Sequence, residues 1–146
     1  MRWIVLPLFL LFLTFLSCQR ETNGPLTTQL SCNNFHPLDS QTVRSNLLGN
    51  WKWLQRTCFW TGSQVTPADK LVQIRFLPNQ TFTVTEAGIQ TKQGSWSLQR
   101  TNDNNWILAM NPASEYLYGL IRFCDSLVVF ADSYVDGCDH LFRREP

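Results

Sequence analysis

Short segments in which apolar and polar residues alternate fill the chain from Trp51 to Arg144, and turn residues separate them. Alternation with a period of two is the pattern of β-strands that bury one face. No stretch between these segments has the length and the 3.6-residue period of an amphipathic helix, so parallel strands joined by helices are excluded. The sequence therefore predicts an antiparallel, all-β domain. Its eight strand segments are 51–60, 71–77, 81–86, 95–100, 106–110, 116–124, 127–134 and 139–144.

Eight antiparallel strands can close into an up-and-down barrel, and closure removes the exposed edges that an open sheet would leave. The interior of such a barrel is filled by side chains or holds one small ligand. Aromatic residues are 13% of the chain and charged residues only 16%, which suits a small barrel filled by rings. We therefore expect a closed eight-stranded barrel in the domain formed by residues 39–146.

A short helix is predicted directly before the first strand. Asp39 or Ser40 can cap its N-terminus, and Gly49 can end it. Val43 and Leu47 are four residues apart and would share one face of this helix. An apolar face of this length can cover one end of the barrel, so the open end should lie on the opposite side.

Residues 1–17 are typical of an export signal. Arg2 precedes a run of 13 residues, Ile4 to Leu16, that is apolar at all but two positions. The run is shorter than the roughly 20 residues that a membrane-spanning helix requires. It ends in Phe15-Leu16-Ser17-Cys18, which resembles the lipobox of bacterial lipoproteins, where the cysteine is acylated and the leader is removed. This predicts lipidation of Cys18; the other interpretation is an ordinary secretory signal that is cut near Ser17.

Residues 18–38 are polar and irregular, with Thr22-Asn23-Gly24-Pro25 and Asn33-Asn34 among them. Such a composition is typical of a tether between an anchor and a folded domain. Gln19, and not an aspartate, follows Cys18, which resembles Gram-negative lipoproteins that are sorted to the outer membrane. We therefore expect a protein that is lipid-anchored to the outer membrane, on either its periplasmic or its surface face.

Six motifs follow one another in the barrel region: Trp51/Trp53, Thr61-Gly62 with Thr66-Pro67, Phe76/Phe82, Gly94-Ser95-Trp96, Asp136-Gly137 and Phe142-Arg143-Arg144. In this order they resemble the small lipocalin-like domain of Bacteroidetes-type lipoproteins. The resemblance covers about two thirds of the chain, from Gly49 to Arg144. It implies a lipocalin-like barrel that binds a small apolar or amphipathic molecule.

The lipocalin pattern combines a tryptophan at the start of the first strand with an arginine near the end of the last. The resemblance therefore implies that Trp51 and Arg144 close the barrel. In that arrangement the guanidinium group covers the indole ring, a cation–π contact that stabilises the closed barrel. The role of both residues would be structural.

Four cysteines follow Cys18, and we expect them to form two disulfides because exported proteins oxidise such residues. If Trp51 faces Arg144 in an antiparallel pair, Cys58 lies opposite position 137, one residue from Cys138. The same strand order places Cys124 at the other end of the barrel, beside the segment that contains Cys32. The predicted disulfides are Cys58–Cys138 and Cys32–Cys124.

No set of residues indicates catalysis. His36 and His140 have no partner at metal-ligand spacing, and the cysteines lack the close pairs of zinc sites. No Gly-x-Ser-x-Gly, phosphate-binding loop or His-Glu-x-x-His motif occurs. The net charge is +1 and no basic stripe is present, which argues against nucleic acid as a partner. We expect a monomer without cofactor, metal or enzymatic activity.

Large inward side chains and residues at the open end, near Trp60 and Tyr134, are the candidates for contact with a ligand. Gln55, Thr57 and Tyr118 are polar, and a ligand is one partner that would satisfy them inside the barrel or at its rim. Two other functions stay open: a protein-binding module (a barrel-type protease inhibitor or an accessory subunit of a surface complex) and a structural lipoprotein with a filled core. The predicted ligand-binding residues are Trp53, Gln55, Thr57, Trp60, Phe76, Trp96 and Tyr118.

Overall fold

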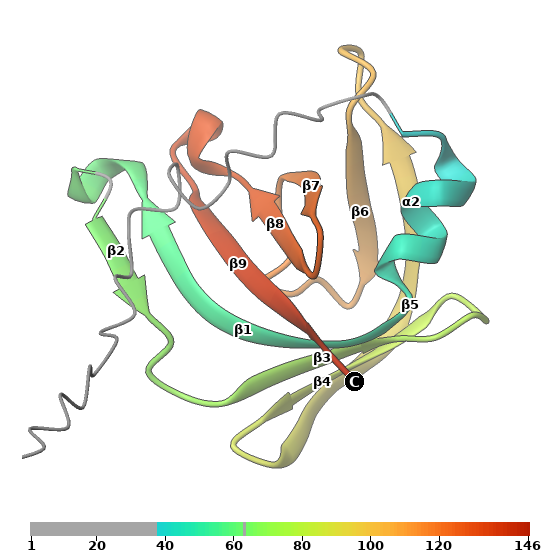
Figure 1. Cartoon of the computed structure of the whole chain (residues 1–146), viewed down its shortest axis with the longest axis horizontal. Coiled ribbons are helices and arrows are strands. Elements are labelled where there is room, and N and C mark those ends of the chain that lie inside the picture. Colours follow the sequence, from blue (N-terminus) through green and yellow to red (C-terminus); the bar gives the residue numbers. More distant parts are fainter. Residues whose placement is uncertain (1–37, 63) are drawn as a thin grey trace, which may run out of the picture.

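The computed structural model describes residues 38–62 and 64–146, in which one antiparallel sheet curves round on itself (Figure 1). Its helices and strands are α2 (Ser40–Leu47), β1 (Gly49–Cys58), η1 (Phe59–Thr61), β2 (Gln64–Pro67), β3 (Val72–Phe76), β4 (Thr81–Glu86), β5 (Ile89–Arg100), β6 (Trp106–Asn111), β7 (Leu120–Cys124), β8 (Leu127–Ala131), η2 (Ser133–Val135) and β9 (Cys138–Glu145), where η marks a 3₁₀ turn.

Strand pairing closes the sheet into a barrel. The strands pair in the order β2-β1-β3-β4-β5-β6-β7-β8-β9, and β9 pairs in turn with β1. Eight strands therefore form the barrel wall, while the short β2 extends only the second half of β1. The predicted fold class, an all-β, eight-stranded antiparallel barrel with a short N-terminal helix, is confirmed.

The strands differ from the predicted ones in several places. β1 ends at Cys58 and β8 at Ala131, before η1 and η2, whereas the predicted segments continue to residues 60 and 134. β5 already starts at Ile89, because a two-residue turn at positive φ lets its first half pair with β4. β7 starts only at Leu120; Tyr116 and Leu117 before it are neighbours that are both buried, which no strand with one buried face allows. β2 is not predicted, since Gln64–Pro67 is mostly polar and short.

α2 covers the end of the barrel where β1 begins (Figure 1). The carboxylate of Asp39 caps the helix, because it accepts hydrogen bonds from the backbone N–H groups of Gln41 and Thr42, both at 2.9 Å. Val43 and Leu47 are buried in the core of the barrel. The helix therefore plugs this end, as the spacing of its two apolar residues predicts.

Trp51 and Arg144 join the first strand, the last strand and the helix. They are paired across β1 and β9, and the guanidinium carbon of Arg144 lies 4.5 Å from the centroid of the Trp51 ring. Arg144 Nη1 donates to the carbonyl of Leu48 at 2.8 Å, and its Nη2 donates to that of Asn46. The indole N–H of Trp51 donates to the Leu47 carbonyl at 2.7 Å. These contacts also place a positive charge at the C-terminal end of α2, where the helix dipole favours one.

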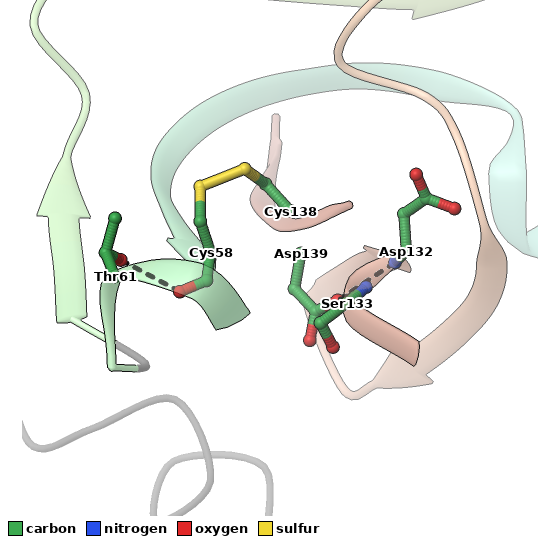
Figure 2. The surroundings of a disulfide bond; sticks show 6 residues. All are labelled: Cys58, Thr61, Asp132, Ser133, Cys138 and Asp139. Carbon is green, nitrogen blue, oxygen red and sulfur yellow. Dashed lines mark hydrogen bonds between the residues drawn. A yellow bond between two sulfur atoms is a disulfide. The ribbon is translucent and has the colours of Figure 1, made fainter. Parts of the chain in front are cut away.

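The predicted Cys58–Cys138 disulfide is confirmed, and it joins the end of β1 to the start of β9 (Figure 2). The sequence predicts a register in which the two cysteines miss each other by one residue. The structure has a β-bulge between Trp53 and Gln55, which adds one residue to β1 and brings the cysteines face to face.

The predicted signal peptide 1–17, the lipidation site Cys18, the tether up to residue 37 and Cys32 lie outside the described residues. Cys124, the predicted partner of Cys32, is disulfide-bonded. In the part of the chain that the structure describes, no helix is long and apolar enough to cross a membrane. The lipid anchor and the Cys32–Cys124 bond therefore stay predictions.

The barrel wall has its fewest backbone pairs between β6 and β7, where only Ile107 and Leu120 face each other. The neighbouring ladders, β5–β6 and β7–β8, have six and five such pairs, and Figure 1 shows β6 and β7 diverging. The loop formed by residues 112–119 connects the two strands and places Tyr116 and Leu117 in the interior. Side chains of this loop, and not of a strand, thus fill part of the barrel.

Candidate functional site

The bulge in β1 decides which side chains face the interior near the disulfide. Residues paired across two strands share a face, and Trp53 lies in the core with its partner Phe142. After the bulge, Arg56 pairs with His140, whose ring lies 5.8 Å from the Trp53 ring, measured between centroids. Arg56 therefore stands on the same face of the sheet as His140, at the end opposite α2, where its side chain is exposed to solvent. We call this end the mouth.

Strand pairing places Gln55 and Thr57 on the other face, where Gln55 is 8% exposed and each has a buried side-chain atom without a hydrogen bond. Their partners in β9 are Leu141 and Asp139, and Leu141 packs with Val129 in an apolar cluster separate from the barrel core. The prediction that both residues share the inner face with Trp53 assumes unbroken alternation along β1. The bulge shifts that alternation by one residue and reverses the two faces beyond it.

Three rings meet inside the mouth: Trp53 from β1, Tyr116 from the 112–119 loop and His140 from β9. The Trp53 and Tyr116 centroids are 5.2 Å apart, and each lies 5.8 Å from that of His140. Only 4%, 5% and 8% of the surfaces of Trp53, Tyr116 and His140 are exposed. Chain segments far apart in the sequence thus build one buried, mainly aromatic site that also carries polar atoms.

Two polar atoms of this three-ring cluster lack partners. Among the described residues, five side-chain atoms are buried without a hydrogen bond: Trp53 Nε1 and His140 Nδ1 in the cluster, Ser114 Oγ in the same loop as Tyr116, and Gln55 Nε2 and Thr57 Oγ1 further along β1. A buried polar group that stays unpaired costs about 1–3 kcal/mol, so folded proteins almost always supply one with a protein, water or ligand partner. Two of the five atoms, Trp53 Nε1 and His140 Nδ1, belong to neighbouring rings of one cluster, which makes the mouth the candidate binding site.

Charged side chains surround the cluster. Lys70 pairs with Glu86, and its Nζ lies 5.8 Å from the centroid of the Tyr116 ring. The hydrogen bond to Glu86, and then the Tyr116 hydroxyl, raise the pKa of Lys70 above its usual value. Lys92 Nζ lies 2.6 Å from a carboxylate oxygen of Glu115, and this hydrogen bond lowers the pKa of Glu115. Both lysines are thus neutralised by a carboxylate.

Two short turns, η1 and η2, form the rim of the mouth, and Figure 2 shows the disulfide between them. The disulfide links the β1 end that precedes η1 to the β9 start that follows η2. Asp139 Oδ1 accepts hydrogen bonds from the backbone N–H groups of Asp132 at 2.9 Å and Ser133 at 2.8 Å, which holds η2 in place. Trp60 on η1 and Tyr134 on η2 are 62% and 61% exposed. The rim therefore presents aromatic side chains to solvent.

His140 is neutral in the folded protein at pH 7. Burial, and then the positive charge of Arg56, lower the pKa of His140 from its usual 6.5 to about 4, although Asp139 and Glu115 act in the opposite direction. Between pH 4 and 6.5, His140 therefore binds fewer protons in the folded protein than in the unfolded chain. Its contribution to stability is therefore complete above pH 6.5 and is lost as the pH falls towards 4.

We predict that acidification from pH 7 to 4 removes on the order of 3 kcal/mol more stability from the wild type than from His140→Gln. Glutamine does not titrate, so carboxylates that titrate in the same range affect both proteins equally and cancel in the comparison. Urea midpoints measured across this pH range provide the test. Parallel pH profiles of the two proteins would contradict a buried, neutral His140.

The other predicted binding residues lie away from the three-ring cluster. Phe76 and Trp96 pack edge to face, with centroids 5.5 Å apart, and the Arg44 guanidinium of α2 lies 5.4 Å from the Trp96 ring. They belong to the core near the closed end, where Trp96 Nε1 already donates to the Thr81 carbonyl at 3.1 Å. Trp60 lies at the rim, and half of the Tyr118 surface is exposed on the 112–119 loop.

Of the predicted binding residues, the structure brings only Trp53 into the cluster. Sequence reasoning misses Tyr116, His140 and Arg56 as site residues. An unbroken alternation assigns Arg56 to the outside, and Tyr116 precedes a strand instead of belonging to one. The sequence offers one signal for this site: the adjacent polar residues Asp139 and His140 begin a strand that continues with apolar and basic residues.

An open groove on the outer wall is a weaker candidate. It lies over β3 and β4 beside the C-terminus and is lined by polar side chains, among them Gln73, Arg75 and Thr83. Gln73 Nε2 already donates to Glu145 at 2.7 Å. The groove carries no buried, unpaired side-chain atom. Within residues 38–62 and 64–146, no group of three or more His, Cys, Asp and Glu residues is arranged to hold a metal ion.

Comparison with known proteins does not assign the chain to a family. No model of a protein family and no curated protein matches the sequence. Among solved structures, the barrel is similar to a DUF4847 family protein from Bacteroides vulgatus ATCC 8482, with 12% sequence identity and a TM-score of 0.44. The match covers 68% of this chain and 94% of the other. A likeness at this level carries no conclusion about what the present protein binds.

Proposed function

We propose that this protein is a lipid-anchored binding protein of the bacterial outer membrane, which holds a small amphipathic molecule in the mouth of its barrel and catalyses no reaction. The anchor rests on the export signal and on Cys18, which resemble those of bacterial lipoproteins. The binding role rests on the three-ring cluster. Binding sites for small molecules are mostly apolar and contain a few polar groups that orient the ligand, and the cluster has this composition.

The observation that carries the proposal is the pair of unpartnered atoms Trp53 Nε1 and His140 Nδ1. Both belong to side chains that are more than nine-tenths buried, and both stand beside aromatic surface. A solid structural core would gain from apolar residues at these positions, since they leave no donor or acceptor unpaired. A ligand with a polar end and an apolar body would satisfy the atoms and cover the rings.

The ligand binds at a shallow depth. Between the three-ring cluster and the closed end, the interior is occupied by large buried side chains, including Phe76 and Trp96, whose rings pack edge to face with centroids 5.5 Å apart. The 112–119 loop supplies Tyr116 to the cluster and leaves the wall at the sparsely paired β6–β7 junction. Movement of this loop is the simplest route by which a molecule reaches Trp53 and His140.

The rim supports a second candidate function, a protein-binding module. Trp60, Tyr134 and Val135 are exposed on two turns whose bases are joined by a disulfide. Exposed aromatic groups on rigid turns are typical contact residues of protein interfaces. In this alternative the barrel is a scaffold for η1 and η2, and the interior plays no part in recognition.

Native mass spectrometry of the protein purified from its own membranes tests the binding role. We predict that the wild type retains a small molecule and that Trp53→Phe, which keeps a ring but loses the N–H donor, retains much less of it. Trp60→Phe at the rim is the matched control and should retain as much as the wild type. A folded wild type without any retained molecule would contradict the proposal, and a loss seen only in Trp60→Phe would place recognition at the rim.

A further inference from the structure

We infer that the ligand is an organic acid, whose carboxylate is held by the Trp53 indole N–H, His140 and the Arg56 guanidinium while its apolar body covers the rings of the mouth. This inference rests on the proposed function and names the chemistry of the same site. The inference goes beyond the proposed function, because a barrel mouth in general could equally well bind an apolar molecule, an alcohol or an amine.

The first step is the direction of the unpaired hydrogen bonds. Trp53 Nε1 is a donor and can never accept, so its partner must be an acceptor. Neutral His140 offers one donor and one acceptor nitrogen, and Ser114 Oγ can donate as well. An ammonium group brings only donors and cannot satisfy the indole. A carboxylate brings two oxygens that accept from several donors at once.

The second step is charge. Arg56 stands opposite His140 on the same face of the sheet, and the two are close enough for its charge to lower the pKa of the imidazole. Among the described residues, Arg56 makes no ion pair, whereas Lys70 and Lys92 are bound to Glu86 and Glu115. The mouth therefore carries one guanidinium that no carboxylate of the described chain neutralises. An anionic group of the ligand supplies the negative charge that neutralises this guanidinium.

Two carboxylates act on His140, those of Asp139 and Glu115, and both are engaged elsewhere: Glu115 is paired with Lys92, and Asp139 is turned away. Asp139 precedes His140 in β9, so its side chain leaves on the opposite face of the strand. Its Oδ1 accepts from two backbone N–H groups around η2, and Figure 2 shows the side chain directed towards that turn. Asp139 is thus engaged in holding the rim, which leaves the indole, the imidazole and the guanidinium to an external acid.

The third step is the size of the apolar part. The interior below the cluster is filled, so a long chain has no channel to enter. The body of the acid can lie against Trp53 and Tyr116 and leave the mouth past the exposed Trp60 and Tyr134. This geometry suits a monocarboxylic acid with an aromatic ring or a short aliphatic chain.

Binding of three probes with the same chain, octanoate, 1-octanol and octylamine, tests the inference. The full-length protein is placed in lipid nanodiscs, empty nanodiscs serve as the blank, and Trp fluorescence reports binding at pH 7.4. We expect octanoate to bind about ten-fold more tightly than 1-octanol, the usual strength of a charge-assisted hydrogen bond. Arg56→Gln and Trp53→Phe should each remove about that factor for octanoate and leave 1-octanol unchanged. Arg75→Gln, on the outer wall, is the matched control and should behave as wild type.

The outcomes separate the two proposals. Equal affinities for octanoate and 1-octanol in the wild type, or an octanoate affinity unaffected by Arg56→Gln, would overturn the acid and leave a mouth that binds amphipathic molecules. Preference for octylamine would overturn it in the same way. Absence of binding of all three probes, together with no retained molecule in native mass spectra, would overturn the proposed function itself.

Discussion

Replacing Cys58 and Cys138 together with serine should lower the free energy of unfolding by about 4 kcal/mol, because the disulfide closes a long loop. The two residues are 80 positions apart, and the entropy that a cross-link removes from the unfolded chain grows with loop length. The bond also ties β1 to β9, the pair of strands that completes the barrel. Urea unfolding of both proteins without a reducing agent provides the two free energies.

The single variants Cys58→Ser and Cys138→Ser are the controls for this prediction. Either one removes the same bond, so both should lose as much stability as the double variant, while the disulfide of Cys124 stays in place. Reduction of the wild type by a thiol is not equivalent, since it also opens that second bond. A loss below about 1 kcal/mol would contradict this prediction. It would mean that the unfolded chain is already restricted without the disulfide, or that the eight residue pairs between β1 and β9 close the barrel without it.

The strands could be predicted because each buries one face in the same core. In β3, Val72, Ile74 and Phe76 are almost fully buried, while Gln73 and Arg75 between them are not. A strand with one buried and one solvent-facing side shows this period of two residues in its sequence. It fails in the 112–119 loop, where Tyr116 and Leu117 are both buried because they enter the interior from a loop.

The closure of the barrel could be predicted to within one residue, from Trp51 and Arg144. The error of one residue comes from the bulge after Trp53, which no glycine or other local signal in the sequence marks. Leu54 lies at the bulge and packs in the apolar cluster of Leu141 on the outer face. The bulge therefore depends on contacts between strands that are distant in the sequence, which a single-chain pattern does not contain.

The same bulge explains why the candidate site could be predicted only in part. Its position at the end opposite α2 follows from strand order, and Trp53 follows from alternation before the bulge. Beyond that point, alternation assigns Gln55 and Thr57 to the inside and Arg56 to the outside, which is the reverse of the pairing observed. Tyr116 and His140 meet only because the barrel closes, so no spacing in the sequence indicates their contact.

Replacing Trp51 with alanine should lower the free energy of unfolding by roughly 3–5 kcal/mol, the cost typical of removing a large buried ring. The Trp51 side chain is almost fully buried at the closed end of the barrel. Its loss also leaves the Leu47 carbonyl without the indole N–H that it accepts at 2.7 Å, and removes the ring surface on which Arg144 lies. Urea unfolding at pH 7 measures the change.

Two further variants show whether the ring only fills space. Trp60→Ala removes the same side chain where it is mostly exposed, and should change stability by less than about 0.5 kcal/mol. Arg144→Met removes the hydrogen bonds to the Asn46 and Leu48 carbonyls and should cost roughly 2 kcal/mol. The double variant Trp51→Ala/Arg144→Met should lose less stability than the sum of the two single losses, because the indole orients the guanidinium that holds α2. Losses that add in full would show that Arg144 anchors the helix without help from the ring.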